Sequence, residues 1–253
     1  MRRAQGYVLY QGPSRLNGEP IVAIATMRTA NVKTGSMVQT WILTAEVSPE
    51  QAVKTGADEA VCGSCPHRHF LNGGCYVVPF QAPRAVWESW RRGLYREAWE
   101  PEAFKGMRVR LGSYGDPAAV PAEVWQEMLK YADASTGYTH QAHRREFQQE
   151  LLTHLMVSAD TPAAALKAHA EGLRTFRVKA QGGPLLPGEI LCATETDPYA
   201  DCSRCLLCSG ARQGGPSVAI NAHGQRARRV PAEQRAAGQM GLSLIPAREL
   251  QPA

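Results

Sequence analysis

Hydrophobic residues in the first part of the chain occur in short runs rich in β-branched and aromatic side chains. Turn-forming pairs such as Asn17-Gly18 separate these runs. Runs of this length between turn signals are typical of β-strands, so a small β-rich segment is predicted over residues 1–45. The predicted strands cover residues 7–10, 21–26 and 38–43.

Beyond this segment, hydrophobic patterns of strands and helices alternate, which predicts an α/β core over residues 46–224. Residues 47–74 form a predicted loop, and a helix over residues 83–95 begins at Pro83. The alternation predicts βαβ units and a parallel sheet, as a partial (β/α) barrel or an open sheet with short helices. Strands are predicted at 107–111, 137–139, 155–158, 175–178, 189–191 and 218–221, and helices at 121–132, 144–152 and 162–171.

Two of these helices carry more specific expectations. Val124, Met128 and Tyr131 share one face of the helix over 121–132, which should face the core. The helix over 162–171 follows Asp160 and Thr161, and Asp160 is expected to be a helix cap. Residues 225–253 are predicted to form a loosely ordered basic tail.

Composition sets the class of protein. The 253 residues are 44% hydrophobic and 20% charged, which is ordinary for a globular chain with a sizeable core. The sequence contains no run of 18 apolar residues, so no membrane span is predicted. Residues 1–6 lack the apolar stretch of a secretion signal, so we expect a cytoplasmic location, in the host cell if the chain is phage-encoded. The net charge of +5 permits contact with nucleic acid, with Arg91-Arg92, Arg144-Arg145 and the arginines of 226–229 as candidates.

All seven cysteines fall into two groups. The first, Cys62, Cys65 and Cys75, has the spacing C-x2-C-x9-C. Thiolates this close reach one metal from a single turn, so the group predicts a metal site with one open coordination position. His67 or His69 could fill that position as a Cys3His zinc site, which spacing alone favours; otherwise the histidines are expected on the loop surface.

The second group combines a strand-end cysteine with three closely spaced ones. It consists of Cys192, Cys202, Cys205 and Cys208. Three thiolates at C-x2-C-x2-C spacing are typical of iron–sulfur ligation, whereas zinc is normally held by two separated pairs. An iron–sulfur cluster is therefore favoured, and a closed structural zinc site is the alternative.

A glycine-rich turn after the strand over 107–111 is a candidate cofactor site. In parallel sheets ligands bind at the carboxyl ends of the strands, where Gly112, Gly115 and Asp116 lie. Tyr138 to His140 and Ser158 to Asp160 end the next two predicted strands, and Arg177 lies in the one after. These residues converge only if the strands are adjacent and parallel.

The order of the motifs resembles a family of poorly characterised phage and prophage proteins with a Cys-Pro to Cys-Tyr loop. The resemblance covers residues 31 to 208 and rests on short motifs. They are Asn31-x-Lys33-Thr34-Gly35, Cys65-Pro66 to Cys75-Tyr76, Gly112-x-x-Gly115-Asp116, Gly137-Tyr138-Thr139-His140, Val157-Ser158-Ala159-Asp160, Phe176-Arg177-Val178 and Ile190-Leu191-Cys192 with the last three cysteines.

That family is in turn similar to radical S-adenosylmethionine enzymes. The similarity implies a partial barrel, a [4Fe–4S] cluster on Cys62, Cys65 and Cys75, and an auxiliary cluster on the second group. Gly112 to Asp116 would then approach the amino group of S-adenosylmethionine, and Tyr114 or Tyr138 could stack on its adenine. Two features depart from the enzyme pattern: the usual spacing is C-x3-C-x2-C, and here a β-rich segment precedes the cysteine loop.

Two hypotheses follow from these patterns. The first is an iron–sulfur enzyme of radical-S-adenosylmethionine-like architecture that modifies nucleic acid or a nucleotide. The second is a non-catalytic, zinc-stapled module that binds nucleic acid or a protein through its basic residues. Metal identity separates the two.

Overall fold

The computed structural model describes residues 5–230 as two five-stranded sheets with short helices, which confirms the predicted α/β class. The strand order is β1-β2-β3-β4-β5 in the first sheet and β6-β7-β8-β10-β9 in the second, so the described residues form no closed barrel. The strands are β1 Gly6–Pro13, β2 Pro20–Thr26, β3 Val38–Thr44, β4 Arg108–Tyr114, β5 Ala134–Thr136, β6 Tyr138–Thr139, β7 Met156–Ala159, β8 Thr175–Lys179, β9 Glu189–Leu191 and β10 Ser217–Asn221.

Strand direction changes once across the first sheet. β1, β2 and β3 pair antiparallel, whereas β3 pairs parallel with β4 and β4 with β5. Every pairing in the second sheet is parallel. The predicted N-terminal β-segment therefore extends the core sheet, and β3 is the first member of the parallel series.

Gly137 joins the two sheets, because it is the residue between β5 and β6. A Cβ atom there would lie 2.6 Å from a methyl carbon of Leu155 and 2.9 Å from Cβ of Leu111. Only glycine lets the chain pass this close to both neighbours. Its amide donates to the carbonyl of Cys208, which brings the second cysteine group to the junction.

The region predicted as a loop over 47–74 contains two short helices. Ser48 caps the first through its side chain, Pro49 begins it, and Gly56 ends it with φ of 88°. These cap signals were present in the sequence and were missed. The α-helices are α1 Pro49–Thr55, α2 Glu59–Cys62, α3 Ala82–Arg91, α4 Ala122–Leu129, α5 Pro162–Ala170, α6 Ala193–Thr196 and α7 Cys202–Cys205.

Two helix predictions were wrong in detail. The helix expected over 144–152 is only a 3-10 helix, Gln149–Thr153, because Gln148 has extended backbone and its side chain accepts a hydrogen bond from the Ala122 amide. In α4 the buried side chains are Ala122, Trp125 and Met128. Tyr131 lies beyond the end of α4 and is exposed, so it does not share that face.

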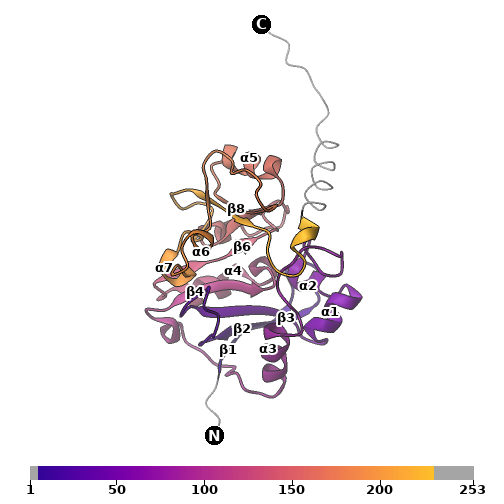
Figure 1. Ribbon diagram of the computed structural model, residues 1–253. Coiled ribbons are helices and arrows are strands. Elements are labelled where there is room, and N and C mark those ends of the chain that lie inside the picture. The colour runs from indigo at the N-terminus through magenta and orange to yellow at the C-terminus, as the bar shows by residue number, and fades with distance from the viewer. Residues whose placement is uncertain (1–4, 231–253) are drawn as a thin grey trace.

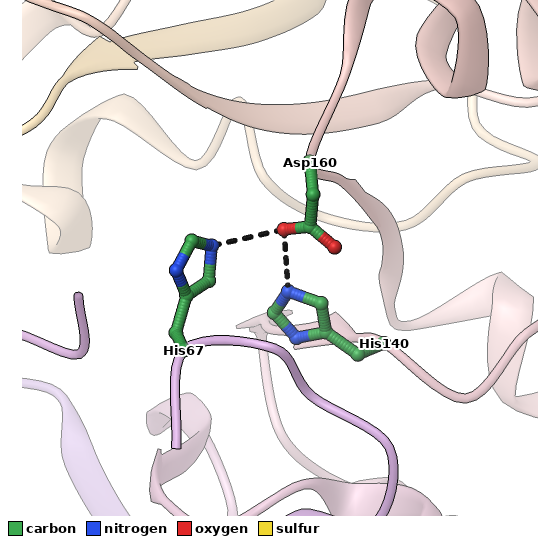
Figure 2. Close-up of side chains that lie close together, drawn as sticks. All are labelled: His67, His140 and Asp160. Atoms are coloured by element: carbon green, nitrogen blue, oxygen red, sulfur yellow. Dashed lines mark hydrogen bonds and ion pairs between the residues drawn. The ribbon is translucent and has the colours of Figure 1, made fainter. Parts of the chain in front are cut away.

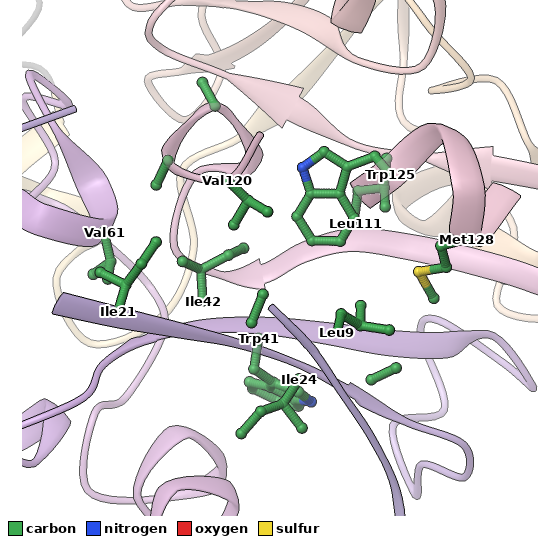
Figure 3. Close-up of a cluster of buried hydrophobic side chains, with 14 of the residues drawn as sticks. Leu9, Ile21, Ile24, Trp41, Ile42, Val61, Leu111, Val120, Trp125 and Met128 are labelled. Carbon is green, nitrogen blue, oxygen red and sulfur yellow. The ribbon is translucent and has the colours of Figure 1, made fainter. Parts of the chain in front are cut away.

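The main hydrophobic core lies against the first sheet (Figure 3). Ile21 and Ile24 of β2 and Ile42 of β3 are fully buried, as are Leu111 of β4 and Trp125 of α4. In Figure 1, α5 lies at the opposite end of the molecule from β1 and α3. No helix in residues 5–230 has the length and apolar character needed to cross a membrane.

Candidate functional site

Both cysteine groups line one cavity of about 260 Å³. Cys62, Cys65 and Cys75 contribute from the first group, and Cys192 and Cys202 from the second. Burial raises the pKa of Cys202 and of Cys208, and neighbouring thiols of the second group raise both further, so this group also clusters in space. Five of the seven cysteines therefore line the same cavity, although they come from two distant segments of the sequence.

Arg68 organises the first cysteine loop from inside. Its guanidinium forms an ion pair with Asp58 at 2.6 Å, and the two side chains are 6% and 2% exposed. It also donates to the carbonyls of Gly56 and Gly63. Burial of Arg68 was not predicted, because the residue lies between two histidines in a region expected to be a loop. His69 is half-buried and contacts the Val77 carbonyl at 2.9 Å.

Two buried residues bind the first loop to the strand ends. Gln141 donates to the Cys62 carbonyl and accepts from the amide and hydroxyl of Ser64. The Asp116 amide donates to the Val61 carbonyl at 2.6 Å. The cysteine loop and the glycine turn after β4 are thus held together.

The second group is built on a short helix. Asp201 caps α7 by accepting from the Arg204 amide, and Leu206 ends it with φ of 51°. The Cys202 amide donates to the Lys33 carbonyl, which links this group to the loop before β3. Arg174 donates to the Leu207 carbonyl and secures the segment that carries Cys208.

Burial governs the state of the thiols. It raises the pKa of Cys62 and Cys65 well above the ordinary value, and the neighbouring thiols of the same group raise it further. Burial also raises the pKa of Cys208 to about 11, although a hydrogen bond from Tyr138 and the charge of Arg110 oppose it. Without a cation these thiols stay protonated at neutral pH, and a bound metal would deprotonate them.

The glycine turn after β4 packs closely against neighbouring backbone and side chains. Gly112 and Gly115 have φ of 67° and 80°, and a Cβ on Gly115 would lie 2.7 Å from Ile42. Between them, Tyr114 is 5% exposed, and its hydroxyl has no hydrogen-bond partner among the described residues. Cys62 and Cys75 are close enough to raise its pKa, after burial, which is the larger cause.

Asp116 is buried at this turn with both carboxylate oxygens engaged. Oδ1 accepts from the Ala118 amide at 3.0 Å, which caps the following 3-10 helix Pro117–Ala119. Oδ2 accepts from the His140 amide at 2.8 Å. Asp116 therefore links the ends of β4 and β6. A hydrogen bond to the ammonium group of a cofactor, as predicted, would be a second role for the same carboxylate.

Arg110 forms a second wall of the cavity. It is 7% exposed, donates to the Tyr138 hydroxyl at 2.9 Å, and lies 4.4 Å from the centre of that ring. Tyr138 also stacks on Phe176 with ring centres 3.9 Å apart, so its ring already has two aromatic or cationic contacts. Among the described residues no carboxylate forms an ion pair with Arg110, unlike Arg68 and Arg177.

The expected convergence at the strand ends is confirmed in most respects. β4, β6, β7 and β8 carry their carboxyl ends to the same cavity, which Gly112, Gly115, Asp116, Tyr138, His140, Ser158 and Asp160 line. Arg177 is the exception. It forms a buried pair with Glu189 at 2.6 Å and stabilises the second sheet instead.

His67, His140 and Asp160 form a compact cluster at this edge (Figure 2). Nε2 of His67 and Nε2 of His140 lie 2.9 and 3.1 Å from the same carboxylate oxygen, Oδ1 of Asp160. Asp160 was expected to cap α5, but Thr161 does so by accepting from the Ala164 amide. His67 was expected either as a ligand of the first cysteine site or on the loop surface; it is buried, so the surface alternative is wrong for it.

The pKa of Asp160 is set by two opposing effects. Burial alone would raise it, but the charge and hydrogen bonds of His140 and His67 lower it well below its ordinary value. Asp160 is therefore held as a carboxylate between two imidazoles. Sequence spacing could not group these residues, because 67, 140 and 160 belong to three separate segments.

Several of the candidate nucleic-acid contacts are used within the protein. Arg144 donates to the Leu16 carbonyl. Arg226 and Arg229 donate to the carbonyls of Gly73 and Asn72 in the first cysteine loop. The predicted loose tail thus begins with an anchored 3-10 helix, Ala227–Arg229, and the rest of it, from residue 231, lies outside the described residues.

Comparisons of the chain with known protein families, curated proteins and solved structures gave no match in any of the three. The resemblance to phage proteins and to radical enzymes therefore stays a prediction. Function has to be argued from the geometry of the cavity.

Proposed function

We propose that the chain is an iron–sulfur enzyme whose two cysteine groups hold clusters at one shared cavity. The observation that carries the proposal is the common lining of that cavity by Cys62, Cys65, Cys75, Cys192 and Cys202. A structural zinc staple gains nothing from facing a cavity, whereas a reactive cluster has to meet a bound molecule. S-adenosylmethionine is the proposed cosubstrate. Cys62, Cys65 and Cys75 would hold the cluster, which, once reduced by an external one-electron donor, would supply the electron that cleaves a carbon–sulfur bond of the cosubstrate.

The position of the first loop supports this proposal. The loop follows β3, the first strand of the parallel series, which is where the resemblance to radical enzymes expects it. β1 and β2 are antiparallel additions at the edge, so the β-rich start of the chain no longer argues against that architecture.

The sequence spacing of the second group also supports a cluster over zinc. Three thiolates at C-x2-C-x2-C spacing are typical of iron–sulfur ligation, whereas zinc is normally held by two separated pairs.

Two polar groups of the cavity suit its proposed occupants. The partnerless Tyr114 hydroxyl lies beside Cys62 and Cys75, where a cluster sulfide or cosubstrate would accept its hydrogen bond. Arg110 is a buried cation at the cavity wall, which suits an anionic molecule such as a nucleotide. A nucleotide, free or within nucleic acid, is the proposed substrate class.

Anaerobic reconstitution with iron and sulfide tests the proposal. The wild-type chain should bind iron and labile sulfide at two sites, while Cys65→Ser and Cys205→Ser should each empty one site and leave the other filled. S-adenosylmethionine should give a calorimetric signal with wild type and Cys205→Ser, and none with Cys65→Ser. Zinc without sulfide in the wild-type chain would instead establish the zinc-stapled module.

A further inference from the structure

We infer that His67, His140 and Asp160 form a binding site for one divalent transition-metal ion at the cavity wall. The three donor atoms lie within 4.8 Å of one another. Two imidazoles and one carboxylate with open positions are the ligand set of mononuclear iron sites, and Mn²⁺ and Zn²⁺ use the same donors. This inference does not depend on the presence of iron–sulfur clusters.

The distances fit coordination of a single ion. Ligand atoms about 2.1 Å from a metal and at right angles to each other are about 3.0 Å apart. The two imidazole nitrogens lie 2.9 and 3.1 Å from Oδ1 of Asp160. A metal on the cavity side of these three atoms would replace the two nitrogen–oxygen contacts with metal–ligand bonds, and the proton on each Nε2 would leave to solvent or move to Nδ1.

The fold presents the three side chains from three rigid positions. His67 comes from the first cysteine loop, His140 follows β6 and Asp160 follows β7 (Figure 2). The His140 backbone is fixed by its hydrogen bond to Asp116. Because the Thr161 side chain caps α5, the Asp160 carboxylate is not used as the helix cap, and it faces the imidazoles instead.

The cluster has one open side. His67, His140 and Asp160 all line the cavity, so the remaining coordination positions would face a molecule bound there. Such an ion would polarise an oxygen of that molecule as a Lewis acid. A purely structural hydrogen-bonded triad would not need a side that opens into the cavity.

Manganese binding to the full-length chain tests the inference. Mn²⁺ prefers oxygen and nitrogen ligands over thiolates, so it probes this site rather than the cysteines. Loss of the electron paramagnetic resonance signal of free Mn²⁺ measures the affinity. We expect one Mn²⁺ per chain in the wild type, and affinity at least about tenfold lower in Asp160→Asn and in His140→Gln.

Two controls separate the alternatives. His169→Gln removes a half-buried histidine that contacts Thr175 and Ser217 and does not line the cavity, and this variant should bind Mn²⁺ as the wild type does. Cys65→Ser should also retain Mn²⁺, even if it loses iron. Absence of binding by the wild type, or unchanged affinity in both Asp160→Asn and His140→Gln, would show a hydrogen-bonded triad only. Loss of Mn²⁺ in Cys65→Ser would assign the ion to the cysteines and overturn the inference.

Discussion

Gln141 donates a hydrogen bond from Nε2 to the carbonyl oxygen of Cys62, 3.1 Å away. Its Oε1 accepts from the amide and the hydroxyl of Ser64, on the other side of the same loop turn. A single fully buried amide just past β6 therefore holds the segment between the first two cysteines. The conformation of the first cysteine loop therefore depends on Gln141, which follows β6, as well as on the residues of the loop itself.

Replacement of Gln141 by leucine should destabilise the chain. The Ser64 amide would lose its partner and the Cys62 carbonyl would keep only the Cys65 amide as a donor. Buried groups left without hydrogen bonds cost about 1–3 kcal/mol. Urea unfolding of the metal-free protein measures the change. Gln213→Leu is the matched control, because Gln213 is exposed and its change should stay within about 0.5 kcal/mol. Equal effects of the two substitutions would contradict the role given to Gln141.

The ion pair between Arg68 and Asp58 should be the most sensitive point of the first loop. Removal of one partner of a buried pair leaves the other charge uncompensated, which costs about 3–5 kcal/mol. Arg68→Met should therefore destabilise the chain strongly and empty the first cysteine site. Arg84→Met breaks a pair with Glu88 whose side chains are 48% and 45% exposed, and it should cost about 0–1 kcal/mol. Comparable losses in the two variants would refute the assignment.

Much of the fold was predictable because local patterns agree with the tertiary structure. All of the predicted strands occur, with ends shifted by a few residues, since β-branched runs between turns report pleated, buried backbone. The helix over 144–152 failed because side-chain contacts of Gln148 override its local helical pattern. Tertiary contacts of that kind are not encoded in the neighbouring residues.

The cysteine groups could be found from spacing, but the site around them could not. The C-x2-C spacing is visible in the sequence, whereas Arg68 and Gln141 belong to no spacing pattern, and only the fold brings them into contact with the first cysteine motif. The cluster of His67, His140 and Asp160 required the order of β6 and β7 in the sheet. Adjacent parallel strands, once known, placed most of the cavity lining correctly.

Acidic pH should destabilise the second sheet, because it protonates Glu189. Burial alone would raise the pKa of Glu189, but hydrogen bonds from Arg177 and the Leu186 amide lower it below its ordinary value. A depressed carboxyl pKa contributes stability that is complete above the unfolded-state pKa of about 4.3 and is lost as pH falls through the folded-state value. The free energy of unfolding should therefore drop below about pH 4, more steeply in the wild type than in Glu189→Gln.

Urea unfolding at a series of pH values measures this slope. Glu146→Gln, which removes an exposed carboxylate, provides the comparison and should follow the wild-type curve. If Glu189→Gln kept the wild-type slope, the stability supplied by the Arg177 pair would not depend on ionisation of Glu189.

Tyr114→Phe should affect different properties of the metal-free and the reconstituted protein. In the metal-free chain the Tyr114 hydroxyl is buried with no hydrogen-bond partner among residues 5–230, so its removal should leave stability unchanged or raise it. In the reconstituted protein the same hydroxyl is proposed to donate to a cluster sulfide or cosubstrate beside Cys62 and Cys75. Loss of that donor should shift the reduction potential of the first site and leave the second unchanged.

Tyr95→Phe is the control, because the Tyr95 hydroxyl lies 3.1 Å from that of Thr26 and its loss should cost about 1 kcal/mol with no effect on either site. A Tyr114→Phe protein with both potentials unchanged would exclude the hydroxyl as a partner of the first site.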